Sequence, residues 1–170
     1  MGGKNVKNTM VERVLEIVAP HPCFGCGKIG TPLCIDCKYD IIHDPFWGCI
    51  ACGTPTAQGV CENHSHAIER AFVPGVRSAA LEDTINGLKF QNVKAAAKEL
   101  ALLLHYYLPL LPSSVRLVPV PTVRAHIRQR GYDQVELIVR HFATLRDLPI
   151  DKVLQRQTTA TQHITGRSER

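Results

Sequence analysis

The 170-residue sequence predicts a small cysteine-rich module near its N-terminus, followed by an α/β domain with part of a parallel sheet. Two observations carry this prediction. Seven cysteines and one histidine form four pairs, and two residues separate the members of every pair. Beyond residue 66, short apolar runs alternate with longer segments of helical periodicity. Strands that alternate with helices indicate a parallel sheet built from right-handed crossovers.

Residues 1–20 are expected to form an N-terminal helix. Thr9 and Glu12 have the spacing of a capping box, and apolar residues follow at helical intervals. Pro20 and Pro22 end this helix directly before the first cysteine pair.

The beginning of the chain carries no apolar run suited to a secretory signal, and no stretch approaches the roughly 20 apolar residues of a membrane span. We therefore expect a cytoplasmic protein. Reduced thiols in that compartment favour metal binding over disulfides.

The four pairs have the number and spacing of ligands for two tetrahedral zinc ions. A glycine follows Cys26 and again Cys52, where a positive φ turns backbone N–H groups toward sulfur. This repeat predicts that consecutive pairs close each site, as a double zinc ribbon over residues 21–66. The expected ligands are Cys23, Cys26, Cys34 and Cys37 for the first ion, and Cys49, Cys52, Cys61 and His64 for the second.

Two alternatives stay open for the ligands. A cross-braced arrangement would alternate the pairs, and His66 would replace His64 if its different spacing were used. In either arrangement protein atoms fill all four positions, so both ions are expected to be structural. A module with so little apolar periodicity needs them, because each zinc would stabilise it by roughly 10 kcal/mol.

Residues 67–170 are expected to form the α/β domain. The apolar runs predict strands over 72–76, 115–120 and 148–154. Helical periodicity predicts a helix marked by Leu81, Ile85 and Leu88, a second over 93–107, and a third from about Asp133. A sheet of about three strands leaves an unpaired edge and an uncovered apolar face, so we expect this domain to be marginally stable.

Arginines cluster in the segment between the second strand and the third helix, which we expect to be a loop over residues 124–131. The net charge is +5, and residues 116–170 hold the surplus, with ten Lys and Arg against five Asp and Glu. Guanidinium groups beside a helix N-terminus favour bound anions. The expected anion-binding residues are Arg124, Arg128, Arg130 and Gly131. A solvated basic face is the alternative.

Over residues 10–170 the sequence resembles the ComF family, bacterial phosphoribosyltransferase-like proteins linked to competence and DNA uptake. The resemblance is carried by Leu88-Lys89-Phe90, by the stretch from Pro119-Val120-Pro121 to Arg130-Gly131-Tyr132, by the Pro-x-x-Cys start and by the tail 162–170. It implies a double zinc ribbon followed by a type I phosphoribosyltransferase domain. It also implies that the arginine segment faces the pyrophosphate of phosphoribosyl pyrophosphate, with magnesium needed in a complete member.

The chain departs from the family in two respects. Asp133 stands where the family usually has Asn, which is harmless if it caps a helix. Type I phosphoribosyltransferases also hold their donor with adjacent carboxylates and a Thr-Thr-Gly turn. The chain has no such motif, since Glu82 and Asp83 lie in a predicted helix. In the family that motif lies beyond the segment matching residues 162–170, so we expect a C-terminally truncated, inactive form.

Three functional hypotheses follow. The first is a ComF-like protein that binds phosphoribosyl pyrophosphate weakly or not at all and acts with competence proteins or single-stranded DNA. The second is a zinc-ribbon adaptor that binds a protein or single-stranded nucleic acid without catalysis. The third, a redox protein using its Cys-x-x-Cys pairs, fits four matched pairs poorly.

Overall fold

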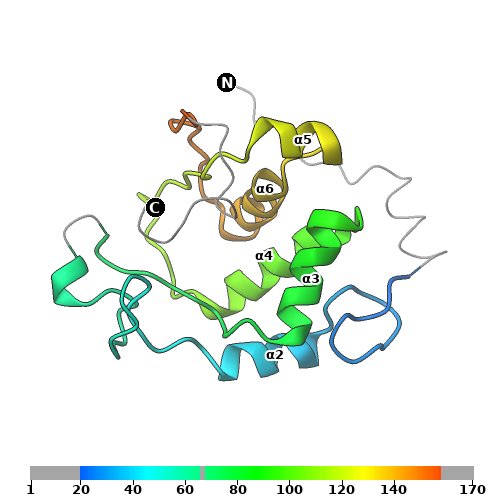
Figure 1. The fold of residues 1–170 in the computed structure, drawn as a ribbon, viewed down its shortest axis with the longest axis horizontal. Coiled ribbons are helices and arrows are strands. Elements are labelled where there is room, and N and C mark those ends of the chain that lie inside the picture. Colours follow the sequence, from blue (N-terminus) through cyan, green and yellow to red (C-terminus); the bar gives the residue numbers. More distant parts are fainter. Residues whose placement is uncertain (1–19, 66–67, 158–170) are drawn as a thin grey trace.

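The computed structural model describes residues 20–65 and 68–157, so the predicted N-terminal helix lies outside the described residues. The elements follow in the order α2 (Ile35–His43), the 3₁₀-helix η1 (Glu62–His64), α3 (Ala79–Phe90), α4 (Ala95–Tyr107), α5 (Arg124–Arg130) and α6 (Gln134–Arg146). Helix α4 is central and packs against α2, α3 and α6 (Figure 1). No helix within the described ranges has the length and apolar character needed to cross a membrane.

Three helices form where the periodicity predicts them. Helix α3 has the apolar face that the sequence predicts, and two of its residues, Leu81 and Leu88, are buried. The predicted break follows, because Gln91 ends α3 and Asn92 takes a positive φ of 58°, which asparagine tolerates better than most residues. Helix α6 begins directly after Asp133.

Two further helices were not predicted by the pattern. Helix α2 follows Cys34 and buries Cys37, Lys38 and Ile41 on one face. The arginine segment is the helix α5 rather than a loop, and Gly131 ends it with a φ of 78°. The physical reason is propensity: arginine, alanine and glutamine are good helix formers, and neither proline nor glycine interrupts the run.

The predicted parallel sheet is not formed among the described residues, which contain isolated bridges instead. Leu117 pairs with Ile150 in the parallel sense, through N–H···O bonds of 2.9 Å to Pro149 and from Asp151. This bridge joins two of the three predicted strands in the expected direction. Residues 72–76 form no strand. Leu148 is buried, and Val115 and Leu117 pack against its core cluster. Without a further strand among the described residues, the remaining valines of the two bridged runs stay exposed, Val120 by 68%.

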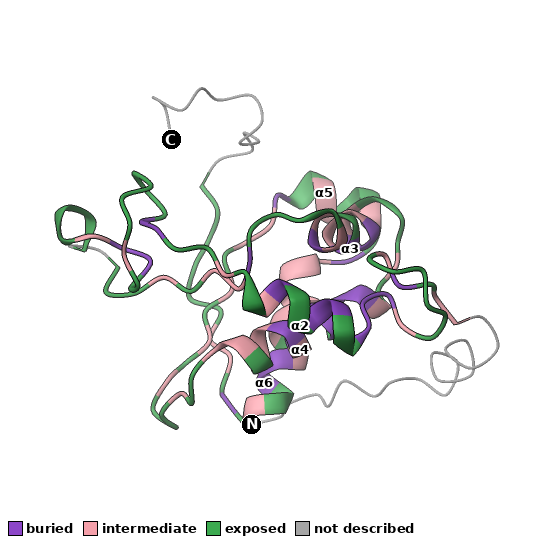
Figure 2. Cartoon of the chain, turned by 90° about the horizontal axis from the view of Figure 1, so that it is seen from below, coloured by how far each residue is buried: buried purple, intermediate pink, exposed green. Residues whose placement is uncertain are grey.

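A shared core connects the first cysteine group with the helices. It contains Cys23, Leu33, Cys34, Cys37 and Ile41 together with Leu81, Leu88, Ala96, Ala97, Leu100, Leu103 and Tyr132. Figure 2 shows these buried positions concentrated where α2 and α4 meet. Lys38 of α2 and Glu99 of α4 form an ion pair within it, with side chains only 5% and 9% exposed. Residues 21–43 therefore pack as part of the helical body.

Candidate metal centres and basic cleft

The first candidate metal centre comprises Cys23, Cys26, Cys34 and Cys37, whose Sγ atoms all lie within 4.8 Å of one another. The Sγ atoms of Cys23 and Cys37 are 3.8 Å apart, and those of Cys26 and Cys34 are 3.6 Å apart. A tetrahedral ion with metal–sulfur bonds of about 2.3 Å separates its sulfur ligands by about 3.8 Å. A disulfide would need about 2 Å. The group therefore has the dimensions of a metal site.

Local structure holds these four thiols in place. The turn from Cys23 to Gly27 is closed by a 2.8 Å bond from the Gly27 N–H to the Cys23 carbonyl, and Gly27 has the predicted positive φ, 75°. The Cys34 N–H donates to the Cys23 Sγ at 3.3 Å. Helix α2 supplies the second pair, because Cys34 is its N-cap and Cys37 lies in its first turn.

The second candidate metal centre comprises Cys49, Cys52, Cys61 and His64, whose ligand atoms also lie within 4.8 Å of one another. The Cys52 and Cys61 Sγ atoms are 3.8 Å apart. His64 presents Nδ1, at 3.7 Å from the Cys49 Sγ and 3.2 Å from the Cys61 Sγ. Gly53, which directly follows the Cys49/Cys52 pair, takes a positive φ of 79°.

The two groups join consecutive pairs, in the order that the internal repeat predicts. His66 lies outside the described residues. The second centre belongs to a limb, residues 44–65, that extends away from α5 and α6 at the left of Figure 1. None of its ligands belongs to the core clusters that the described residues form.

Each centre contains one acidic thiol. Burial raises the pKa of Cys23, but backbone N–H groups, chiefly that of Cys34, outweigh it and bring the pKa from 9.0 to about 6. The Cys61 backbone N–H lowers the pKa of Cys49 to about 6 as well. Burial and neighbouring thiols raise the pKa of Cys37. A cation would thus find one thiolate ready at neutral pH and would displace the protons of the other thiols.

The donor sets fit zinc. Thiolates and imidazole are its usual structural ligands, and four protein ligands close a tetrahedral site. Neither group leaves a position for water or substrate, so an ion here would stabilise the fold without taking part in a reaction.

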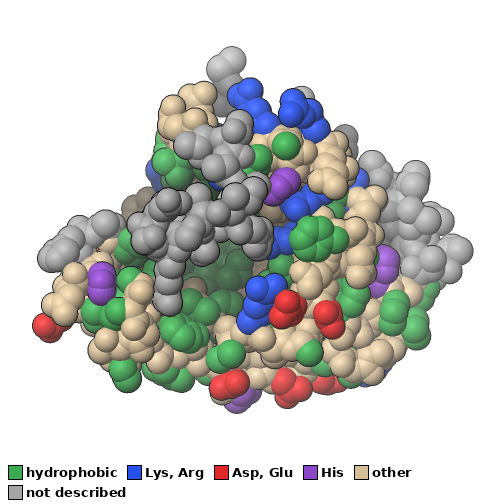
Figure 3. Space-filling model, in the orientation of Figure 1, with side chains coloured by type: hydrophobic (Ala, Val, Ile, Leu, Met, Phe, Trp, Pro, Cys, Tyr) green, Lys and Arg blue, Asp and Glu red, His purple; other side chains and the backbone are tan. Residues whose placement is uncertain are grey.

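A cleft of about 660 Å³ lies between the end of α3, the helix α5 and the start of α6. Its polar lining consists of Lys89, Asn92, Thr122, His126, Gln129, Arg130, Tyr132, Gln134 and Arg156. Figure 3 shows Lys and Arg side chains extending from the region of α5 toward the upper end of α3, while Asp and Glu side chains lie on the lower part of this face. The cleft is therefore suited to an anion.

Arg130 is held in a defined position within the cleft. Its Nη1 donates to Gln134 Oε1, and its guanidinium lies over the Phe90 ring, 5.4 Å from the centroid. Burial lowers the pKa of the adjacent Lys89, and the charges of Arg130 and Arg77 lower it further. A bound anion would offset this repulsion between like charges.

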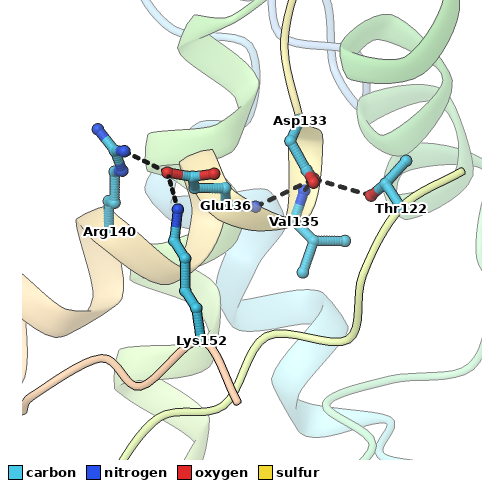
Figure 4. A network of polar contacts seen from close by, with 6 residues as sticks. All are labelled: Thr122, Asp133, Val135, Glu136, Arg140 and Lys152. Atoms are coloured by element: carbon cyan, nitrogen blue, oxygen red, sulfur yellow. Dashed lines mark hydrogen bonds and ion pairs between the residues drawn. The ribbon is translucent and has the colours of Figure 1, made fainter. Parts of the chain in front are cut away.

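Asp133 caps helix α6, and the cap changes the expected anion site. Its Oδ1 accepts hydrogen bonds from the Val135 N–H at 2.9 Å, the Glu136 N–H at 3.3 Å and the Thr122 Oγ1 at 2.8 Å (Figure 4). These two N–H groups are therefore taken, and the helix end does not offer them to a ligand. An anion in the cleft would therefore be bound by cationic side chains and not by these backbone N–H groups.

Of the four predicted anion-binding residues, Arg130 lines the cleft, while Arg124, Arg128 and Gly131 are exposed outside its lining. The helical conformation of α5 explains why Arg130 lines the cleft and the other arginines of this helix do not. Residues four apart share a helix face, so His126 and Arg130 face the cleft and Arg124 and Arg128 face away.

The arginine pattern does not identify Lys89, His126, Gln129 or Arg156 as part of the site. For Lys89, one feature of the sequence could have indicated a role in the site: it belongs to the Leu88-Lys89-Phe90 motif of the family resemblance.

Comparisons with protein-family models, with curated proteins and with solved structures return no significant match. The resemblance to the ComF family therefore rests on the motifs of the sequence.

Proposed function

We propose that this chain is a ComF-like protein of the phosphoribosyltransferase family, whose basic cleft binds the pyrophosphate group of phosphoribosyl pyrophosphate. One observation carries the proposal. Two of the motifs that carry the family resemblance, residues 88–90 and 119–132, are far apart in the chain but both contribute residues to the lining of the same cleft. The Tyr132 hydroxyl donates to the Leu88 carbonyl and joins them directly.

The proposal includes the surroundings of the cleft. The parallel bridge between Leu117 and Ile150 would belong to a sheet of the type I phosphoribosyltransferase kind. Zinc would occupy both metal centres and supply folding energy. The protein would work in the cytoplasm, together with competence proteins that handle imported DNA.

We propose that this cleft binds the donor, and we assign no transfer step to the residues that line it. In the family, adjacent carboxylates followed by a Thr-Thr-Gly turn hold ribose, magnesium and the 5′-phosphate, whereas Glu82 and Asp83 of this sequence lie inside α3 and no such turn follows them. Lys89 and Arg130 can bind the pyrophosphate by charge-assisted hydrogen bonds. They supply no group that would stabilise a sugar cation or activate an acceptor.

Calorimetric titration with phosphoribosyl pyrophosphate and Mg²⁺ tests this proposal through a matched pair of variants. Arg130→Ala removes a cleft cation, whereas Arg128→Ala removes the same charge from the exposed face of α5. We expect Arg130→Ala to weaken binding by roughly 10-fold or more, the usual value of a charged hydrogen bond, and Arg128→Ala to leave it nearly unchanged. Equal losses, or a wild-type protein that does not bind, would contradict the proposal.

A second candidate function is the adaptor, and the limb favours it. Trp47 and Ile50, beside the second centre, are 66% and 49% exposed. Residues 44–65 contain Asp44 and Glu62 but no lysine or arginine, so this surface suits a protein partner better than nucleic acid. Titration with the donor and with single-stranded DNA at two salt concentrations separates the functions: donor binding favours the ComF-like function, whereas salt-sensitive DNA binding alone would favour a nucleic-acid adaptor and contradict the choice of a protein partner.

A further inference from the structure

The first metal centre makes direct contact with the helix that leads into the cleft. Phe24 lies between Cys23 and Cys26, and its ring occupies the space beside Gly87 of α3. A Cβ atom added to Gly87 would lie 2.6 Å from Phe24 Cζ and 2.7 Å from Cε2. Gly25 approaches the start of α3 in the same way, since its added Cβ would lie 3.0 Å from the Ala80 Cβ. The Cys23–Cys26 turn therefore packs against both ends of α3.

Gly87 in turn determines where the cleft residues of α3 lie. Its carbonyl accepts the Gln91 N–H at 3.2 Å and the Val93 N–H at 3.1 Å, which closes the turn after α3. Lys89 and Phe90 are the last two residues of α3, directly before this turn, and line the cleft. A shift of Gly87 would move both side chains relative to Arg130.

The second centre provides a natural comparison. Ile50 holds the position in the Cys49–Cys52 turn that Phe24 holds in the Cys23–Cys26 turn. Its side chain is 49% exposed, and its centre shares no core cluster with the helices in the part of the chain that the structure describes. The two metal-binding turns are alike in sequence but differ in what they touch.

We propose that Phe24 is a positioning residue: the metal-loaded first centre, acting through the Phe24–Gly87 contact, holds Lys89 and Phe90 in the arrangement that binds an anion. The second centre has no such role. This inference rests on the proposed function, because it concerns the anion site in the same cleft.

The test uses the full metal-loaded chain and four substitutions. Phe24→Ala removes the ring, Phe24→Leu keeps an apolar group in its place, and Ile50→Ala makes the equivalent change at the second centre. Gly87→Ala is a further variant, which displaces the ring from the other side without touching a metal-binding turn. For each we would measure bound metal, affinity for phosphoribosyl pyrophosphate with Mg²⁺, and hydrogen exchange of the amides of residues 88–93.

We expect every variant to retain two equivalents of metal. Phe24→Ala and Gly87→Ala should weaken donor binding at least fivefold and speed amide exchange over residues 88–93. Phe24→Leu should restore most of the affinity, and Ile50→Ala should match the wild type in both measurements.

Unchanged exchange over residues 88–93 in both Phe24→Ala and Gly87→Ala would overturn the inference. An equal loss of affinity in Ile50→Ala would overturn it as well. If the wild-type protein does not bind the donor, the proposed function fails, and the exchange measurement alone decides whether Phe24 positions this turn.

Discussion

Asp133 shows how one side chain can redirect a binding site. Its carboxylate satisfies two N–H groups at the start of α6 and also accepts from Thr122, so it fixes the helix end and one cleft wall together. The sequence could predict the cap, because Asp before a periodic segment favours it. It could not predict that the cap would exclude the helix end from anion binding, since that depends on which atoms the carboxylate reaches.

We expect Asp133→Asn to leave stability nearly unchanged, because Asn caps helices as well as Asp. Removing the negative charge beside the cleft should strengthen phosphoribosyl pyrophosphate binding by about two- to fivefold. Asp133→Ala, in contrast, should lower the free energy of unfolding by about 1–2 kcal/mol. Urea denaturation and calorimetric titration of both variants check this, and equal destabilisation by the two substitutions would contradict it.

At the scale of elements, α2 and α4 are joined by a buried ion pair. The Lys38 ammonium binds the Glu99 carboxylate between the two helices, and both side chains are almost fully buried. Because Lys38 directly follows the metal ligand Cys37, this pair links the first centre to the central helix.

Breaking this pair should cost more than replacing it. We expect Lys38→Met alone to lower the free energy of unfolding by about 3 kcal/mol, because it leaves the Glu99 carboxylate buried without a partner. Lys38→Met combined with Glu99→Leu should recover most of that loss, since apolar residues of similar size can fill the same space. Guanidinium denaturation of the metal-loaded proteins measures both; a double variant no more stable than the single one would count against this account.

The elements also show what the sequence could predict. Periodicity over a long segment identifies α3, α4 and α6, whose apolar faces are encoded locally. Helix α5 is short and highly charged, so charge clustering suggests a loop although its propensity favours a helix. Strands depend on partners that can be remote in sequence, and within residues 20–65 and 68–157 only Leu117 and Ile150 pair as predicted.

At the scale of the whole molecule, the first metal centre belongs to the helical body and the second to the limb. Ligand spacing predicts both centres, because each pair is encoded within four residues. It does not predict the packing of Phe24 on Gly87, which joins residues far apart in the chain. Within the described residues, the first centre shares a core with α3 and α4 and the second does not, so the cysteine-rich segment itself has two parts.

Limited proteolysis should show this division. We expect brief chymotrypsin digestion of the metal-loaded protein to cut first at Trp47 or Phe72, which are exposed and lie outside helices. Phe90, exposed but held in α3, and the buried Phe142 should be cut later. Residues 21–43 should remain associated with α3 and α4 after the cut. Mass spectrometry of the fragments identifies the sites, and early cleavage within residues 79–107 would contradict the shared core.

The central claim is that two independent metal centres, each closed by four protein ligands, organise this chain. Elemental analysis of the purified protein, together with Cys26→Ser and Cys52→Ser, tests it most directly. We predict two equivalents of zinc in the wild type and one in each variant. Fewer than two equivalents in the wild type, or disulfides among the seven cysteines, would contradict the claim.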